Sequence, residues 1–235
     1  MSTEAERRSL YSSIALCPLQ CEGIVNDREA GLIPRSYFWG EDCTGVDLLI
    51  VSKNPANAPS WESALYSSTP PERLAEVHLE IVRDVFSGRR SVPSNYHANL
   101  LRRVAAILGV EATPTAVFGR TAMTALAKCQ SSGAKTAKIP GSTYSTCAER
   151  HLFREIAHFK PVYLLALGKE PYEFLVDPSI VSRHGLPVGK LWHPSWSNMP
   201  GGEAAYFANE LAALHRQFVA ALASRESVAA RRADA

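Results

Sequence analysis

Four of the five cysteines fall into two pairs that could hold a metal centre. Cys17 and Cys21 lie near the N-terminus, and Cys129 and Cys147 lie on either side of a loop that contains Gly, Lys and Pro. Thiolates bind zinc ions and iron-sulfur clusters because a soft, charged sulfur matches a soft or borderline metal. Unrelated thiols are the alternative, and the pairing alone does not decide between the two. A centre that binds both pairs would tie the start of the chain to its middle.

The composition limits the class of protein. With 235 residues, 46% of them apolar, the chain suits one globular domain over residues 1–223. The core of such a domain is large enough to be stable without disulfides or bound metals. The segment 224–235 is small, polar and charged, and we expect it to be disordered. An odd number of cysteines and the lack of a signal-peptide pattern argue against a secreted disulfide framework and favour a reducing, cytoplasmic location.

Membrane and nucleic-acid partners are limited by the same composition. No apolar run approaches the roughly 20 residues that a membrane-spanning helix needs. The net charge of +2 neither demands nor excludes nucleic acid, because a local basic cluster and not the whole-chain charge attracts phosphate. We therefore expect no membrane partner.

Short apolar runs alternate with amphipathic segments, which predicts an α/β fold. The runs at 46–51 and 161–167 are apolar on both faces, as in strands of a parallel sheet that is covered on both sides. A further short strand is expected at 190–192. Helices are expected at 4–16, 70–87, 99–108, 148–158, 170–175 and 203–222. This order predicts a three-layer α/β/α sandwich around a short, mainly parallel central sheet.

Several short motifs follow one another along the chain. They are the first cysteine pair, Ser52-Lys53-Asn54-Pro55 after the first strand, Lys128-Cys129, Cys147, the strand that ends in Ala166-Leu167-Gly168, and His193-Pro194-Ser195. Each motif alone is weak, but in their order and approximate spacing over residues 17–200 they resemble the iron-sulfur type of the uracil-DNA glycosylase superfamily.

The resemblance implies a DNA glycosylase that hydrolyses the N-glycosidic bond of uracil, or of a related deaminated base, and so begins base excision repair. The target base is flipped out of single- or double-stranded DNA into a pocket. In the family, a group in the first loop positions water, and the histidine donates to the uracil oxygen where negative charge grows. These roles map to Asn54 and His193, on loops expected at the carboxyl ends of neighbouring strands. The alternatives are ordinary Asn-Pro turn chemistry for Asn54 and a structural histidine for His193.

The resemblance also implies a cofactor and further contacts. Cys17, Cys21, Cys129 and Cys147 would ligate one structural 4Fe-4S cluster, and Cys43 would be left out. Uracil-containing DNA is the expected partner of a monomeric protein. Tyr96 is a candidate to stack on the base, and the expected substrate contacts are Ser52, Lys53, Pro55, Tyr96, Asn99 and Ser195.

Contacts to the DNA duplex are expected from two groups of residues. Trp196 and Met199 would form an apolar wedge in the minor groove. Arg120, Lys135 and Lys138 would bind phosphates, unless they belong to solvated loops.

The chain also departs from the family. Many members carry a carboxylate in the first loop, approximately Gly-Glu-x-Pro-Gly, whereas this loop resembles the Gly-x-Asn-Pro-Gly loop of other branches, with Ser52 and Ala56 in place of the glycines. An amide cannot accept a proton, so slower excision is expected. Ala125 lies near the position of an asparagine that reads the base, and Asn57, Asn95 or Asn99 could replace it. A DNA-binding protein with weak or no excision, and an unrelated zinc protein, remain as alternatives.

Overall fold

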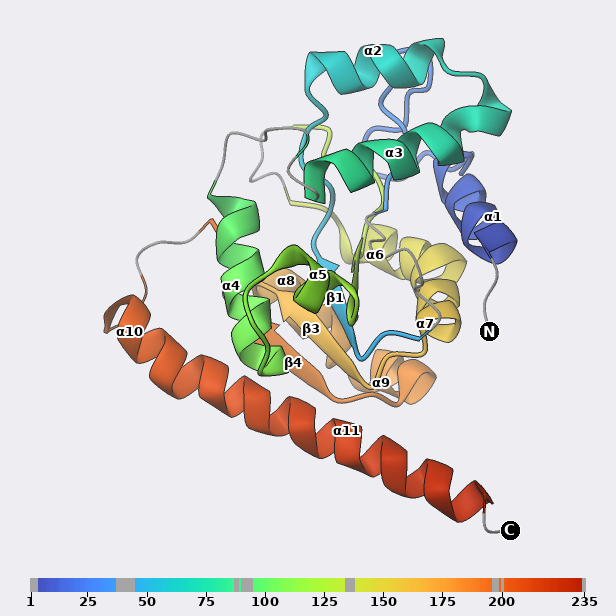
Figure 1. The fold of residues 1–235 in the computed structure, drawn as a ribbon. Helices are drawn as coiled ribbons and strands as arrows, with labels where there is room; N and C mark the ends of the chain where they lie inside the picture. The colour runs from blue at the N-terminus through green and yellow to red at the C-terminus, as the bar shows by residue number, and fades with distance from the viewer. Residues whose placement is uncertain are drawn as a thin grey trace.

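The protein has an α/β fold built on a four-stranded, all-parallel sheet (Figure 1). The computed structural model describes residues 4–36, 45–86, 89, 95–133, 138–195, 199 and 201–233. The strand order is β2-β1-β3-β4. The strands are β1 (Leu48–Ser52), β2 (Thr121–Ala125), β3 (Tyr163–Leu167) and β4 (Val188–Leu191).

Helices cover both faces of the sheet. Leu49 and Val51 face one core, with α1 (Glu4–Ala15), α3 (Leu74–Phe86), α6 (Gly141–Cys147) and α7 (Phe153–Phe159). Leu48 and Ile50 face the other core, with α4 (Tyr96–Leu108), α5 (Pro114–Phe118), α10 (Gly202–Tyr206) and α11 (Ala212–Ala233). Alternate residues of β1 therefore enter opposite cores, as expected for a central strand of a sheet between two helical layers.

The remaining helices connect these layers. The segment before α3 contains α2 (Ser60–Ser68) and the short η1 (Pro71–Arg73). The turn η2 (Ala148–Leu152) joins α6 to α7, and η3 (Phe207–Leu211) joins α10 to α11. After β3 come α8 (Lys169–Leu175) and α9 (Pro178–His184). In the described ranges, no helix combines the length and the apolar character that crossing a membrane requires.

Several element boundaries differ from those expected. α4 begins at Tyr96, the helix expected at 148–158 is the second half of a longer helical run that begins with α6, and α2, α5 and α9 were not predicted. β2 was also missed because its sequence, TAMTA, has no long apolar run, although each of its residues is buried. Its threonines are satisfied internally, since Thr121 donates to the carbonyl of Val117 and Thr124 to Glu155.

The C-terminal segment corrects one expectation. α11 continues to Ala233, where the composition predicted a disordered tail from 224. Alanine and arginine make up most of this segment and have high helix propensity. Arg225 also forms an ion pair of 2.7 Å with Asp47, at the amino end of β1. Helix propensity and this contact explain why the helix extends past the core.

A buried polar network lies among α2, α3, α7 and the sheet. Nζ of Lys128 contacts Glu155, and Glu155 accepts hydrogen bonds from Thr124 (2.8 Å) and Ser36 (2.7 Å). The network continues through the carbonyl of Ser36, which accepts from Nε2 of His78. Each of these groups is buried, so each needs its partner, because an unsatisfied polar group in a core costs about 1–3 kcal/mol.

His78 makes the stability of this fold dependent on pH. The hydroxyl of Tyr66 lies 2.6 Å from Nδ1 of His78, and Nε2 donates to Ser36, so the neutral ring is satisfied at both nitrogens. Burial lowers the pKa of His78 to about 4, with Arg35 acting in the same direction. The folded state favours the neutral form of His78. The contribution of His78 to the free energy of unfolding is therefore complete above its unfolded pKa of about 6.5 and is lost as the pH falls from there to about 4.

We expect the free energy of unfolding to fall by about 3 kcal/mol through His78 alone between pH 7 and pH 4. Urea unfolding of the wild type and of His78→Gln at both values tests this. Glutamine offers a donor and an acceptor but does not titrate. Between pH 7 and pH 4, the free energy of unfolding of His78→Gln should therefore fall by about 3 kcal/mol less than that of the wild type. Equal losses in the two proteins would show that His78 does not titrate with unfolding.

Candidate functional site

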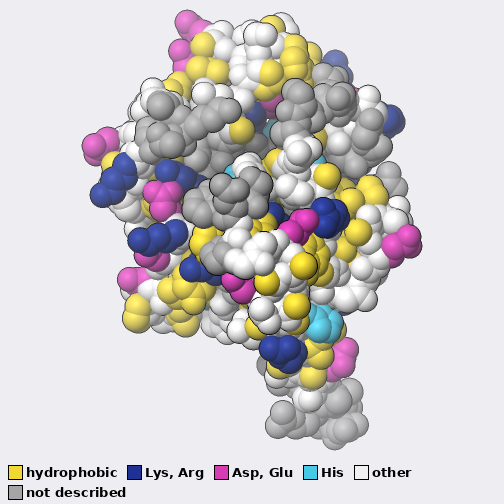
Figure 2. Space-filling model, turned by 90° about the vertical axis from the view of Figure 1, so that its left-hand side faces the viewer, with side chains coloured by type: hydrophobic (Ala, Val, Ile, Leu, Met, Phe, Trp, Pro, Cys, Tyr) yellow, Lys and Arg dark blue, Asp and Glu magenta, His cyan; other side chains and the backbone are white. Residues whose placement is uncertain are grey.

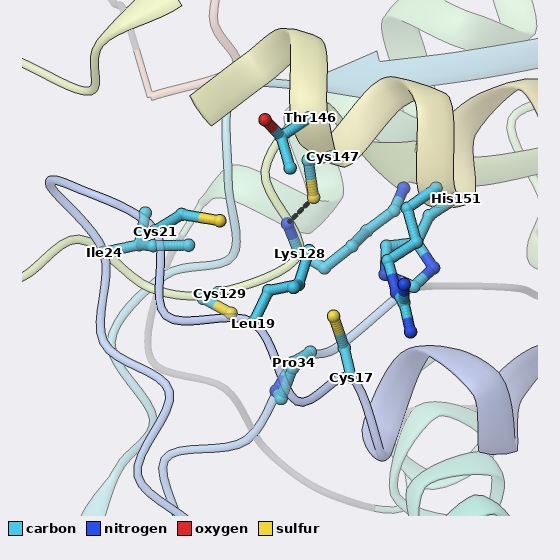
Figure 3. Close-up of a pocket in the computed structure, with 11 residues that line it drawn as sticks. Cys17, Leu19, Cys21, Ile24, Pro34, Lys128, Cys129, Thr146, Cys147 and His151 are labelled. Carbon is cyan, nitrogen blue, oxygen red and sulfur yellow. Dashed lines mark hydrogen bonds between the residues drawn. The ribbon is translucent and has the colours of Figure 1, made fainter. Parts of the chain in front are cut away.

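The four paired cysteines line one pocket (Figure 3). Cys17 and Cys21 lie in the loop after α1, Cys129 lies in the loop after β2, and Cys147 is the last residue of α6. Apolar, basic and hydroxyl-bearing side chains complete the wall, namely Leu19, Ile24, Pro34, Lys128, Thr146, Arg150 and His151. The structure therefore brings together the cysteines that the sequence paired. Cys43 lies outside the described residues.

Backbone hydrogen bonds hold the two cysteine loops together. The Asn26 amide shapes the first loop by donating to the carbonyls of Cys17 (2.7 Å) and Leu19 (3.0 Å). Val25 donates to the carbonyl of Gln130, and Ser132 donates to that of Gly23. Gly23 has φ of +79°, and a Cβ there would lie 2.9 Å from Pro140, so this close approach requires glycine. The start of the chain is thus attached to its middle at the cysteines.

The four thiols lie close enough to influence one another. Burial raises the pKa of the Cys129 thiol, and negative charge on Cys147, Cys17 and Cys21 raises it further. Burial also raises the pKa of Cys147, but the nearby Lys128 acts against this, and its backbone N–H donates to Sγ of Cys147 at 3.3 Å. These four cysteines are free thiols. A bound cationic centre would relieve the repulsion between their thiolates.

The pocket also contains a buried histidine without partners. The ring of His151 is 1% exposed, and neither of its nitrogens has a hydrogen-bond partner among the described residues. Burial lowers its pKa to about 3, with the charges of Lys128, Arg150 and Arg154 acting in the same direction. An orphaned ring beside four thiols fits a bound group whose acceptor atoms would complete the wall. No three His, Cys, Asp or Glu side chains in the described ranges are arranged to hold a single metal ion.

Asn54 lies beside the cysteine loop, just after the carboxyl end of β1. Its Nδ2 donates to the carbonyl of Pro55 at 3.1 Å and lies 3.5 Å from that of Cys129. Carbonyls only accept, so Nδ2 faces them and Oδ1 is left as the acceptor. In the described part of the chain, the hydrogen bonds of this side chain all come from Nδ2. The amide oxygen can therefore accept a hydrogen bond from water.

His193 follows β4 and has a defined tautomer. The backbone N–H of Ser195 donates to Nδ1 at 3.3 Å, so the proton of the neutral ring is on Nε2. Partial burial lowers the pKa of His193, and the charge of Arg103 lowers it further. The ring of Tyr96 lies 5.4 Å from that of His193, at an angle of 46°. His193 is therefore an exposed residue whose neutral ring carries its proton on Nε2 and has an aromatic neighbour.

Two side chains of α4 hold the His193 loop. Asn99 donates to the carbonyl of Pro194 at 3.0 Å. Nη1 of Arg103 lies 3.2 Å from the carbonyl of Trp192 and 3.3 Å from that of His193. Arg103 was not among the predicted residues, although an arginine among Leu100, Val104 and Ile107 on the apolar face of α4 signals a buried, paired charge. The loop is thus fixed from one rigid helix.

One geometric expectation is wrong. Asn54 and His193 do follow strands that end at the same edge of the sheet, but these strands are not neighbours, because β3 lies between β1 and β4. The loop after β3, which contains Gly168, therefore lies between the two predicted catalytic loops.

The other predicted substrate contacts are divided between structural and accessible positions. Ser52 is buried and donates to the carbonyl of Thr124, and Pro55 is also buried. Lys53 forms an ion pair of 2.8 Å with Glu170. Asn99 is occupied with the His193 loop, whereas Ser195 is exposed. Ser52 and Asn99 thus shape the loops through these hydrogen bonds.

The positions of two of the predicted DNA contacts do not support their expected roles. Met199 is buried and accepts from Arg103, so it packs in the core and does not form an exposed wedge. Arg120 precedes β2 and pairs with Asp47 at 2.8 Å, at the amino edge of the sheet, opposite to the loops of Asn54 and His193. Lys138 is exposed, while Trp196 and Lys135 lie outside the described residues.

On the face drawn in Figure 2, the lysine and arginine side chains of the described residues lie among acidic ones and do not form one large basic patch. Any attraction to phosphate on this face is therefore local.

The sequence matches no protein-family model and no curated protein. The functional assignment therefore depends on the motifs and on the geometry described above.

Proposed function

We propose that this protein is a monofunctional uracil-DNA glycosylase of the iron-sulfur type. The observation that carries the proposal is the tautomer of His193. Nδ1 of the ring accepts from the backbone, so the neutral ring carries its proton on Nε2, on an exposed residue that follows the carboxyl end of β4. A donor of this kind is suited to stabilise the negative charge that grows on a departing base.

The residues around His193 support the same chemistry. Tyr96 offers an aromatic face next to the donor, against which a flipped base can stack. Oδ1 of Asn54 can orient a water molecule toward the anomeric carbon of the sugar. Asn99 and Arg103 fix the backbone of the His193 loop, so the donor is held in place before the charge develops.

The cysteine pocket would hold a 4Fe-4S cluster with a structural role. Cys17, Cys21, Cys129 and Cys147 would be its ligands, and such a cluster joins each thiolate to a different iron atom. The Lys128 N–H at Cys147 and the orphaned ring of His151 fit this group, because thiolates and sulfides bound to iron accept hydrogen bonds. The cluster would tie the loop after α1 to the loop that supports Asn54.

The experiment combines a colour test with an excision assay. Protein purified without oxygen should be brown and contain iron, whereas a zinc protein would be colourless. Uracil-containing single- and double-stranded oligonucleotides are then incubated with the protein, and alkali cleaves the abasic sites that form. Alkali-sensitive strands are the expected result.

A second function is favoured by the lack of a carboxylate in the 52–56 loop. A protein that holds the cluster and binds uracil-containing DNA, but releases no uracil, would be a DNA-binding member of the same fold. This outcome would refute the proposed glycosylase activity but not the proposed cluster.

A further inference from the structure

Glu170 is a carboxylate that follows β3, the strand between those that precede Asn54 and His193. It lies in the first turn of α8, directly after β3. Because β1, β3 and β4 are parallel and adjacent in that order, the loop after β3 emerges between the loops of Asn54 and His193. The backbone N–H of Gly168 donates to the carbonyl of Leu191 at 2.8 Å, which joins this loop to the end of β4.

A direct contact joins Glu170 to the loop of Asn54. Oε2 of Glu170 lies 2.8 Å from Nζ of Lys53, the residue before Asn54. The Glu170 side chain is 41% exposed, so the carboxylate is open to solvent and to a bound substrate. The ion pair fixes one carboxylate oxygen beside the water-orienting loop.

The reaction needs such a group. As the N-glycosidic bond breaks, the sugar gains positive charge, and the attacking water must lose a proton. The amide of Asn54 can orient water but can neither accept its proton nor offset the charge of the sugar. The 52–56 loop contains no carboxylate.

We propose that Glu170, held by Lys53, is the catalytic carboxylate of this enzyme, an inference that rests on the proposed glycosylase function. The electron pair of the bond leaves with the base, which departs as an anion stabilised by His193. The oxygen of water forms the new bond to the anomeric carbon, and Glu170 accepts the proton of that water. Proton transfer to the base through solvent then gives free uracil and an abasic site, with no other reactant.

The test is single-turnover excision by Glu170→Gln, which keeps the size of the side chain and removes its charge. We expect the chemical step to slow about 100-fold, while the affinity for uracil-containing DNA changes by no more than about twofold. The matched control is Glu173→Gln, on the same helix, where an exposed glutamate pairs with Lys169 at 3.5 Å. It should excise uracil at the wild-type rate.

A second variant separates catalysis from support of the loop. Adding Asn54→Asp to Glu170→Gln places a carboxylate on the neighbouring loop and should recover much of the lost rate. Wild-type excision by Glu170→Gln would overturn the inference while the glycosylase function stands. The inference is also overturned if the rate and the DNA affinity fall together and Asn54→Asp restores neither. If the wild type releases no uracil, the proposed function fails, and the role of Glu170 fails with it.

Discussion

Replacing His193 with alanine is expected to slow uracil release by roughly 100- to 1000-fold in single-turnover assays. The imidazole is already oriented, because Ser195 donates to Nδ1 and Arg103 holds the carbonyl of His193. A donor fixed in this way stabilises the anion of the base without reorganisation, so its loss acts on the chemical step. DNA binding, which depends on other contacts, should weaken far less. Quenched-flow excision and DNA binding, measured separately, give the two effects.

The control for this prediction is His193→Gln, which keeps an N–H donor on a flexible side chain and should retain more activity than alanine. The wild-type rate should also hold between pH 8 and about pH 6.5, because partial burial and Arg103 lower the pKa of His193 and favour the neutral ring. If DNA affinity falls as much as the rate in His193→Ala, the histidine contributes to binding and not to the departure of the base.

Replacing Cys129 with serine is expected to abolish binding of the proposed 4Fe-4S cluster completely. The thiol is buried, and the charges of the other three cysteines disfavour its thiolate unless a metal centre compensates. Serine is a poor ligand for iron and leaves one iron atom without its thiolate. Because the pocket joins the loop after α1 to the loop after β2, soluble protein should also decrease. Iron content, visible absorbance and soluble yield measure the three effects.

Cys43→Ser is the matched control, since Cys43 belongs to neither pair, and it should keep the iron, the colour and the yield of the wild type. A Cys129→Ser protein with the full iron content would rule out the assignment of ligands. Zinc in place of iron in the wild type would keep the four cysteines as a site but exclude a cluster.

The sequence predicted the elements whose residues are apolar on both faces. β1 and β3 are buried along their whole length, so their hydrophobic runs are visible without any knowledge of the fold. β2 is equally buried but contains two threonines, whose hydroxyls find partners only after α5 and α7 have packed beside it. Local pattern therefore identified β1 and β3 and missed β2.

The sequence by itself determined which residues have the right chemistry: paired thiols, an amide after β1 and a histidine after β4. These follow from residue type and from position along the chain. Only the tertiary structure decided which of them meet. Strand order placed β3, and with it Glu170, between the two loops, and the packing of α4 buried Arg103 and Met199 behind His193. Strand order and side-chain burial depend on contacts between residues far apart in the chain, and no local pattern contains them.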